Sequence, residues 1–454
     1  MYCFSMKIYG CQMNVYDADR LRTALVSRGW LETPEEEADI VIFVTCSIRD
    51  KAEQKVWSEI GRLNSAEGRT PPAIAVAGCM AQRTGTQLMK RYSSVCLVCG
   101  PRSLGKLPGE LENVMRTGQR VSLLDENPVS LDDLAVAPLL RANPWKAFIT
   151  IANGCDNFCT YCIVPYVRGR FISREPVVIF REVEELVSSG VREITLIGQN
   201  VNTYGRDFDN GYVFSSLLDD VASMDGVERV RFSTSHPKDL TKDVVDVMSR
   251  RPSVCPGINL PIQSGSDQIL KLMNRGYTVE KFASIVEMIR SALPDGSLTS
   301  DLIVGFPGET SADFERSVEA VERFRFDMIH TAAYSPREGT SAAGIEGQIS
   351  GPEKRRRLGV VNSIQTVISQ EINEALVGRT FSVLADGTAP RGDSMLQGRT
   401  PSDKVVIFPG DISMLGSFFR VRITGTKKWC LSGEVVKADG KASLGVKCDG
   451  LDQV

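Results

Sequence analysis

The sequence predicts an α/β protein built in three consecutive parts: a parallel-sheet domain, an open barrel of strand–helix repeats, and a small β-barrel. Over residues 1–125, apolar runs of strand length alternate with amphipathic stretches. The same alternation returns on a larger scale over residues 147–376. Residues 377–441 carry short β-rich runs punctuated by glycines and prolines, without helical periodicity.

The first part reads as a small α/β domain on a parallel sheet. Its candidate strands are FSMKIYG (4–10), DIVIFVT (39–45), AIAVAG (73–78) and SVCLVCG (94–100). Helical stretches are expected between them, around 17–28 and 50–63. Residues 126–146 contain three prolines and no clear periodicity, so they are expected to form a linker.

The central part, residues 147–376, reads as six strand–helix repeats. The candidate strands are AFITIA (147–152), EITLIG (193–198), RVRFST (229–234), INLPIQ (258–263), SDLIVG (300–305) and IHTAAY (329–334). Six repeats are too few to close an eight-unit barrel, so an open, TIM-like (β/α)6 barrel is predicted. The charged segment EKRRR (353–357) leads into an amphipathic helix expected to end near Leu376.

The last part, residues 377–441, carries five short strands, the number found in the small OB-like barrels that bind oligonucleotides. Over 379–441 there are ten Lys or Arg and six Asp or Glu, a net charge of +4 in a chain of net −3. This local excess hints at a surface that faces phosphates, although a merely solvated basic face fits the charge nearly as well.

Composition limits the classes of function. With 42% hydrophobic and 24% charged residues the chain is typical of globular proteins, and no run is long and apolar enough to span a bilayer. We therefore expect a cytoplasmic protein whose twelve cysteines bind metal or stay as thiols. Two histidines, His236 and His330, leave little room for a catalytic triad beside a histidine-rich metal site.

The most informative motif is GCDNFCTYC, which carries Cys155, Cys159 and Cys162. A [4Fe–4S] cluster normally takes four cysteines, so three thiolates on one loop imply an iron that remains open to another ligand. The spacing differs from the paired CxxC of a zinc finger and from a thioredoxin-like dithiol.

A second set of three cysteines emerges from the strand assignment. Cys11, Cys46 and Cys79 each follow a predicted parallel strand, and the carboxyl ends of such strands share one edge of the sheet. They could hold a second cluster with an open iron, and the alternative is that they are buried core cysteines. The CxxC of Cys96 and Cys99 lies within an apolar strand and is read as core. The remaining cysteines show no pattern and are read as structural: Cys3, Cys255, Cys430 and Cys448.

The cysteine loop resembles that of the radical S-adenosylmethionine superfamily, whose open iron binds the amino and carboxylate groups of S-adenosylmethionine. With YGCQMN, VTCSIRDKAEQK and VAGCMAQ, the three-part layout is similar to the methylthiotransferases. That resemblance implies an auxiliary [4Fe–4S] cluster on Cys11, Cys46 and Cys79, a radical cluster on the other three cysteines, and a C-terminal TRAM barrel that binds substrate.

Within that family the motifs NFCTYCIVPYVRGR, GQNVNTYG, STSHPKD, LPIQSGSD and LKLMNRGYT resemble the MiaB branch. That branch modifies isopentenylated adenosine next to the tRNA anticodon. The resemblance implies that the radical cluster cleaves S-adenosylmethionine to abstract a ring hydrogen, while the auxiliary cluster supplies sulfur that a second S-adenosylmethionine methylates. The sister branches act on threonylcarbamoyl-adenosine or on a ribosomal protein. A non-enzymatic iron–sulfur sensor that binds RNA is an alternative of another class.

The resemblance also suggests contacts with S-adenosylmethionine. The turn that meets its methionine amine maps onto Gly198, Gln199 and Asn200, and the strand near its adenine maps onto Gly305, although these glycines could simply shape turns. His236 could line the substrate cavity, but a structural histidine is the preferred reading. The implied partners are the tRNA anticodon stem-loop, S-adenosylmethionine and an electron donor such as flavodoxin or ferredoxin, with no membrane.

Overall fold

The computed structural model describes residues 1–47, 50–65, 71–124, 140–390, 394–427 and 429–436, with backbone alone at 50–52. These residues divide into two compact units, 1–369 and 370–454. The first predicted part and residues 147–369 of the second therefore lie in one unit, and the boundary between these two parts stays a prediction. Residues 126–139 of the predicted linker, and Cys448, lie outside the described residues.

The N-terminal sheet is parallel throughout, in the order β2-β1-β3-β4-β5-β6. Its four longer strands confirm the predicted ones: β1 Cys3–Tyr9, β3 Ile40–Thr45, β4 Ala73–Gly78 and β5 Val95–Cys99. The sequence reading missed the edge strands β2 Leu31–Glu32 and β6 Val121–Leu123, which have two and three residues. Strands this short show no alternating pattern.

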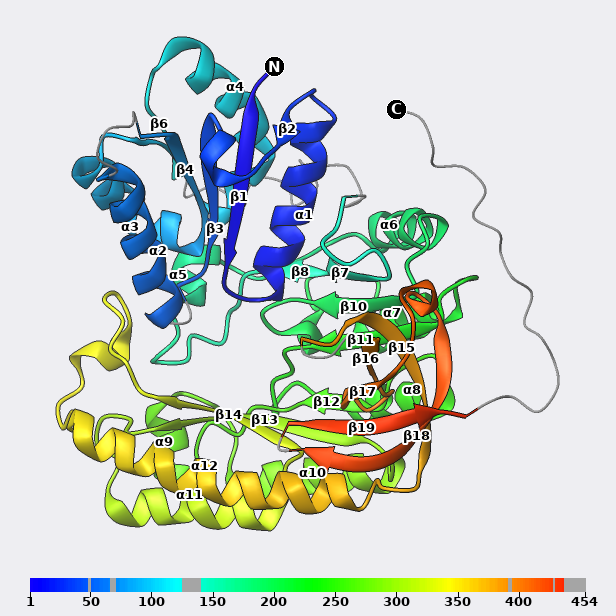
Figure 1. The fold of residues 1–454 in the computed structure, drawn as a ribbon. Helices are drawn as coiled ribbons and strands as arrows, with labels where there is room; N and C mark the ends of the chain where they lie inside the picture. The colour runs from blue at the N-terminus through cyan, green and yellow to red at the C-terminus, as the bar shows by residue number, and fades with distance from the viewer. Residues whose placement is uncertain (48–49, 66–70, 125–139, 391–393, 428, 437–454) are drawn as a thin grey trace. The chain divides into compact units, whose positions relative to one another are not determined.

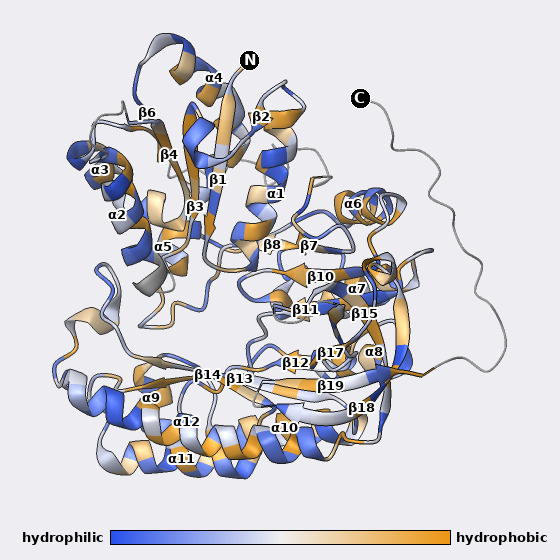
Figure 2. Cartoon of the chain, viewed as in Figure 1, coloured by the Kyte–Doolittle hydropathy of each residue, from blue (hydrophilic) through white to orange (hydrophobic). Residues whose placement is uncertain are grey.

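Helices cover both faces of this sheet, which explains its continuous apolar runs (Figure 1). Alternate residues of β3 point in opposite directions: Ile42 packs in a core with α1 Gln12–Val26 and α4 Leu107–Thr117. Phe43 packs in a second core with α2 Asp50–Asn64 and α3 Cys79–Arg91. Every residue of β3 is buried, and Figure 2 shows β3 and β4 as hydrophobic strands.

The central part has the six predicted strands, in two three-stranded parallel sheets, β7-β10-β11 and β12-β13-β14. An isolated parallel bridge between Val230 and Val254 lies where the two sheets meet. The strands are β7 Lys146–Thr150, β10 Glu193–Ile197, β11 Arg229–Ser233, β12 Gly257–Asn259, β13 Ser297–Val304 and β14 Met328–Ala333. The predicted strand 258–263 is shorter than expected because Pro261 has no N–H for the ladder.

Helices alternate with these strands, as expected for a partial barrel. The longer ones are α6 Pro176–Ser188, α7 Phe214–Ser223, α8 Lys242–Arg250, α10 Val279–Ala292, α11 Ser311–Phe324 and α12 Gly351–Glu374, with short α5 Val164–Arg168 and α9 Asp267–Leu272. Helix α10 buries Phe282, Ile285, Val286 and Ile289 on one face, as expected for the helix of a strand–helix repeat. The predicted charged segment 353–357 is the first part of α12.

The second unit contains a closed five-stranded barrel in the order β15-β16-β17-β19-β18. Its strands are β15 Thr380–Thr388, β16 Met395–Arg399, β17 Val405–Pro409, β18 Phe418–Lys427 and β19 Cys430–Val435, which confirms the predicted small barrel. The interior is apolar, with Val383, Phe408 and Val421 fully buried. On β18 the alternate residues Arg420 and Arg422 are exposed.

Candidate active site

Cys11, Cys46 and Cys79 lie at the edge of the N-terminal sheet predicted for them. Cys46 follows the last residue of β3, Cys79 follows the last residue of β4, and Cys11 stands two residues after β1. The side chains of Cys11 and Cys46 are hydrogen-bonded to each other, and the Cys11 thiol acts electrostatically on Cys79. The tertiary structure therefore gathers thiols that are 33 or more residues apart in the sequence.

Asn14 and Gly10 fix the turn that presents Cys11. The Asn14 side chain is fully buried; its Oδ1 accepts from the Cys11 N–H at 3.2 Å, and its Nδ2 donates to the Thr45 carbonyl at 2.8 Å. Gly10 has φ +145°, and a Cβ there would lie 2.3 Å from the Cβ of Cys46. The turn after β1 thus approaches the end of β3 so closely that a side chain at position 10 would collide with a thiol-bearing residue.

A buried arginine from the barrel reaches this group of thiols. Arg168, at the end of α5, donates from Nε to Cys79 Sγ at 3.2 Å and from Nη1 to Asn153 Oδ1 at 3.0 Å. Its third partner is Asp17 Oδ2 at 3.3 Å. Burial opposes the charge of Arg168, but Cys79, Asp17 and Cys11 outweigh it, so the pKa of the guanidinium is raised.

The thiols of this first set differ in acidity. The hydrogen bond with Cys46, with help from Arg168, lowers the pKa of Cys11 to about 6 against the effect of burial. Burial raises the pKa of Cys79, and Arg168 only partly offsets that effect. Cys11 therefore exists more readily than Cys79 as the thiolate, which is the form that binds iron.

The second set, Cys155, Cys159 and Cys162, lies on one loop between β8 Ala152–Asn153 and α5. Burial raises the pKa of Cys162 to about 12, with further contributions from the thiols of Cys159 and Cys155, so all three are close enough to interact. Gly154 has φ +78°, and a Cβ there would lie 2.0 Å from the Arg170 carbonyl. The loop is therefore packed against the chain that returns after α5.

The loop is also anchored to the turn after α9. Thr160 donates from its backbone N–H to the Met273 carbonyl at 3.1 Å and from Oγ1 to the Leu272 carbonyl at 2.9 Å. Arg275, 5% exposed, then donates from Nη1 to Cys159 Sγ at 3.4 Å and from Nη2 to the Pro261 carbonyl at 3.3 Å. Each set of thiols thus has one buried arginine whose N–H points at one of its sulfur atoms.

Seven buried side-chain oxygen and nitrogen atoms that lack a hydrogen-bond partner among the described residues lie where the barrel strands end. They follow β10, β11, β12 and β14 and belong to Gln199, Asn200, Asn202, Ser235, His236, Gln263 and Tyr334. Buried polar atoms are nearly always paired in a complete structure. Ligands of open parallel barrels bind at this end of the strands, so the orphan atoms indicate a polar ligand site.

The turn predicted to meet S-adenosylmethionine belongs to this group. Asn200 is buried, its Nδ2 donates to Asp239 Oδ2 at 2.7 Å, and its Oδ1 has no partner in the described part of the chain. Gln199 Oε1 is also buried and unpaired there. Two carbonyl-type acceptors side by side in the sequence suit a ligand that carries an ammonium group.

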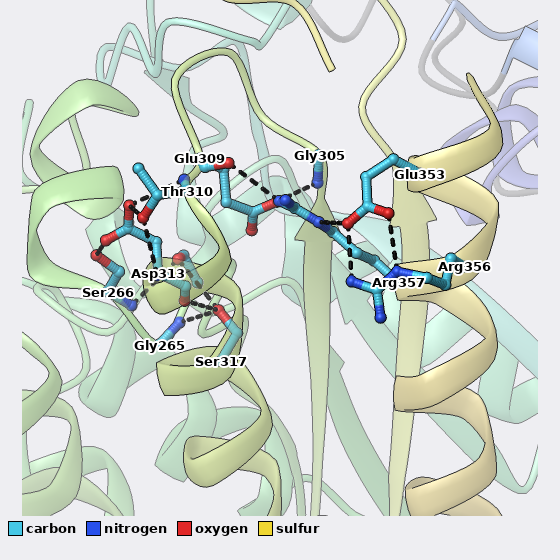
Figure 3. A network of polar contacts seen from close by, with 11 residues as sticks. Gly265, Ser266, Gly305, Glu309, Thr310, Asp313, Ser317, Glu353, Arg356 and Arg357 are labelled. Atoms are coloured by element: carbon cyan, nitrogen blue, oxygen red, sulfur yellow. Dashed lines mark hydrogen bonds and ion pairs between the residues drawn. The ribbon is translucent and has the colours of Figure 1, made fainter. Parts of the chain in front are cut away.

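Gly305 ends β13 in a tight polar network (Figure 3). Its N–H donates to Glu309 Oε2 at 2.5 Å, and the same oxygen accepts from Arg357 Nη1 at 2.5 Å. With φ +69°, a Cβ on Gly305 would lie 2.4 Å from Cγ of Lys354. The N–H of Gly305 is therefore taken, and the side chain of Lys354 fills the space where a Cβ would stand.

His236 lies between the orphan atoms and Arg275. Its Nδ1 accepts from the Lys238 N–H at 3.3 Å, and its ring packs edge-on against Tyr277 with centroids 5.7 Å apart. Burial, together with Arg275 and Lys238, lowers the pKa of His236 to about 2. The ring is therefore neutral, its proton is assigned to Nε2, and that N–H has no acceptor among the described residues.

The two sets of thiols fit four-iron clusters better than single metal ions. Within the described ranges, no group of three or more His, Cys, Asp and Glu side chains is arranged to hold one metal ion. In a [4Fe–4S] cluster each thiolate binds a different iron, so the sulfur atoms need not converge on one point. Three thiols and a buried arginine, which offsets the negative charge of such a cluster, are present at both sites.

The sequence motifs indicated all six cysteines but not the residues that form hydrogen bonds with them. They singled out neither Arg168 nor Arg275, because a buried arginine has the same sequence signature as an exposed one. Cys96 and Cys99 are confirmed as core: Cys99 is fully buried, and Cys96 Sγ donates to the Ile74 carbonyl at 3.3 Å. Among the described helices, none is long and apolar enough to cross a membrane.

Three family models match the chain in consecutive segments. Residues 4–100 match an uncharacterised protein family, UPF0004; residues 149–321 match the radical SAM superfamily; and residues 374–436 match the TRAM domain. These segments contain most of the N-terminal parallel sheet, most of the partial barrel and the small β-barrel, respectively.

Curated proteins similar to the chain share one name. The tRNA-2-methylthio-N(6)-dimethylallyladenosine synthase of Moorella thermoacetica is 45% identical over 95% of this chain and 98% of its own length. The protein of the same name from Natranaerobius thermophilus is 41% identical over 94% of this chain and 95% of its own length. Among solved structures, the radical S-adenosylmethionine methyltransferase TsrM of Kitasatospora setae shares the fold, with a TM-score of 0.53 and 16% identity over 85% of this chain and 79% of that one.

Proposed function

The chain belongs to the family of the tRNA-2-methylthio-N(6)-dimethylallyladenosine synthases, and we propose that it adds a methylthio group to C2 of N6-isopentenyladenosine beside the tRNA anticodon. The observation that carries this conclusion is the 45% identity, which extends over 95% of the chain and so includes all three of its parts. Because relatives at this identity share one name, the sister substrates and the non-enzymatic sensor are not favoured.

We propose that Cys155, Cys159 and Cys162 hold one [4Fe–4S] cluster and that Cys11, Cys46 and Cys79 hold the other. Both assignments are supported by the gathering of the thiols and by the buried arginine at each set. When bound, the clusters and S-adenosylmethionine supply the one-electron chemistry, the sulfur atom and the methyl group of the reaction.

The protein's own contribution is position and electrostatics. Arg168 and Arg275 donate hydrogen bonds to ligand sulfur atoms, and each places one positive charge where an anionic cluster would otherwise be buried without compensation. The low exposure of Cys46, Cys79 and Cys159 excludes water from the thiol side of both sites.

We assign the contacts with S-adenosylmethionine to the barrel edge. Gln199 and Asn200 are proposed to accept from its ammonium group through their unpaired oxygens, as the fit of these atoms suggests. Gly198 is proposed to leave room for it, and Gly305 is proposed to lie beside it, held in place by the network of Glu309 and Arg357.

The partner we propose is the anticodon stem-loop of tRNA, with the TRAM barrel as part of the RNA-binding surface. A flavodoxin or ferredoxin is proposed as the source of electrons. Since tRNA is the substrate, we expect the protein to work in the cytoplasm.

The function is tested by mass spectrometry of tRNA nucleosides from a strain that lacks the gene, with and without the gene restored. Loss of the 2-methylthio form of isopentenyladenosine, with recovery on restoration, is the expected result. Loss of a threonylcarbamoyl derivative instead would assign the chain to the sister branch. For the purified protein, iron content after anaerobic isolation should be about eight per chain, and about four would exclude the second cluster.

A further inference from the structure

An aromatic side chain points outward from the tip of the cysteine loop. Phe158 directly precedes Cys159, its side chain is 38% exposed, and its backbone has φ 45°, which non-glycine residues rarely adopt. Asn274 holds it there, since its Nδ2 donates to the carbonyls of Asn157 at 3.2 Å and Phe158 at 3.1 Å. The fold thus maintains an unfavourable backbone conformation that leaves a phenyl ring in solvent.

A second exposed ring lies against the first. Tyr166, on α5, is 52% exposed and packs edge-on against Phe158, with ring centroids 6.2 Å apart. Exposed aromatic residues that touch each other are uncommon on a surface that contacts only water, because burying them would be favourable. The pair therefore indicates a surface that some partner covers.

Positively charged side chains lie over Phe158 and contact the two residues that precede it in the loop. Arg170, whose side chain is 74% exposed, lies over the Phe158 ring at 5.7 Å from its centroid. Arg170 and Arg206 both form ion pairs with Asp156, whose side chain is 15% exposed. On the other side of the loop, Lys238 Nζ donates to Asn157 Oδ1 at 2.6 Å. One largely covered carboxylate is therefore paired with two exposed arginines, and a third exposed cation contacts the neighbouring Asn157.

Resting on the proposed function, we propose that Phe158, Tyr166, Arg170, Arg206 and Lys238 form a stacking surface for the unpaired RNA bases next to the target adenosine. Unpaired bases in RNA loops are bound by stacking on aromatic rings and guanidinium planes, with nearby cations on the phosphates. The target base has to leave its stack to reach a buried site, so its neighbours lose a stacking partner that these rings can replace.

Charge favours RNA over a protein partner for this surface. A surface that binds another protein would be expected to have an apolar centre and a polar rim. Here Arg170 lies over the Phe158 ring, and the nearby carboxylate of Asp156 is shared between Arg170 and Arg206. The pattern of exposed aromatic rings and cations is that of single-stranded nucleic-acid binding sites.

The test uses the protein loaded with its clusters and a synthetic anticodon stem-loop that contains isopentenyladenosine. A second copy of this RNA carries 2-aminopurine next to the target, so that its emission reports stacking, and a perfect RNA duplex serves as the loop-free probe. Affinity and emission are measured for the parent, Phe158→Ala, Tyr166→Ala and Arg170→Ala. Val177→Ala, at a 61% exposed position of α6, and Arg192→Ala, at a 47% exposed side chain, are the matched controls.

We expect each aromatic variant to bind the stem-loop about tenfold or more weakly and to lose quenching of 2-aminopurine, with duplex binding unchanged. The slope of log K against log salt concentration should become shallower by about one for Arg170→Ala, whereas Arg192→Ala should leave it unchanged. Iron content is measured in parallel. If Phe158→Ala loses iron, the RNA affinity of Tyr166→Ala, a substitution on the exposed side of α5, tests the proposal in its place.

The proposal is overturned if Tyr166→Ala and Arg170→Ala bind the stem-loop as the parent does, or if the aromatic variants weaken stem-loop and duplex equally. If the variants bind RNA as the parent does while the parent still forms product, the proposed function stands and this surface is assigned to a protein partner. Absence of methylthio product from the parent would instead remove the proposed function.

Discussion

Arg168 donates from Nε to Cys79 Sγ over 3.2 Å, although the two residues are 89 positions apart. The cysteine follows β4 of the N-terminal sheet, and the arginine ends the helix that follows the cysteine loop of the barrel. One side chain therefore joins the first set of thiols to the helix after the cysteine loop, and its rigid, permanently charged guanidinium suits that position better than a lysine would.

Replacing Arg168 with Gln is expected to destabilise the protein and to lower its iron content. The substitution leaves Asp17 buried without its cation, and breaking a buried pair in this way costs about 3–5 kcal/mol. The measurement is the urea midpoint together with iron per chain. Adding Asp17→Asn should recover part of the stability, because it removes the orphaned charge. A single variant with the parent's midpoint and iron would show that the contact is dispensable.

Replacing single cysteines should separate the two clusters. Cys159→Ala is expected to abolish both cleavage of S-adenosylmethionine and formation of product. Cys46→Ala should spare part of that cleavage while it blocks sulfur insertion, because it disturbs the other set. Chromatography of the products of S-adenosylmethionine cleavage measures the first activity, and chromatography of nucleosides from digested tRNA measures product formation. Full product from Cys46→Ala would refute the auxiliary-cluster assignment, and Cys99→Ala, at a core cysteine, controls for loss of a thiol in the same domain.

Two glycine substitutions should have opposite effects on stability. Gly305→Ala is expected to lower the free energy of unfolding by about 1–2 kcal/mol or more, since φ is +69° and the new Cβ would meet Lys354. Gly359→Ala should raise it by about 0.5–1 kcal/mol, because the position is exposed within α12, with nothing within 4 Å. Thermal and urea unfolding test both, and a neutral Gly305→Ala would show that Lys354 moves aside at little cost.

His236 should make stability depend on pH below neutrality. Burial lowers its pKa to about 2, so the unfolded chain takes up a proton more readily than the folded one. The stability that depends on the neutral ring is complete above the unfolded pKa of about 6.5 and is lost as pH falls through the window below it.

Between pH 6.5 and 5.5 this loss should be about 1 kcal/mol larger for the parent than for His236→Gln, whose side chain does not titrate. Urea unfolding of both proteins at several pH values between 7.5 and 5 measures the difference. Parallel curves for the two proteins would mean that the ring is protonated in the folded state or accessible to water.

Most strands could be predicted because their residues carry the pattern themselves. All six residues of β3 are apolar or Thr and are buried on both faces, and each strand of the partial barrel is bounded by polar or glycine-rich turns. The strands β2 and β6 could not, since two or three residues at a sheet edge show no periodicity. The extent of β12 was overestimated because Pro261 was counted as part of a strand whose ladder it cannot join.

The sequence by itself determined the six thiols, the order of the three parts and the edge at which Cys11, Cys46 and Cys79 meet, because parallel strands place their carboxyl ends together. The tertiary structure alone decided which charges face those thiols. Arg168 and Arg275 contact Cys79 and Cys159 across 89 and 116 positions, and Asn14 joins the turn after β1 to the end of β3. Such contacts depend on how separate elements pack, and local spacing carries no information about that packing.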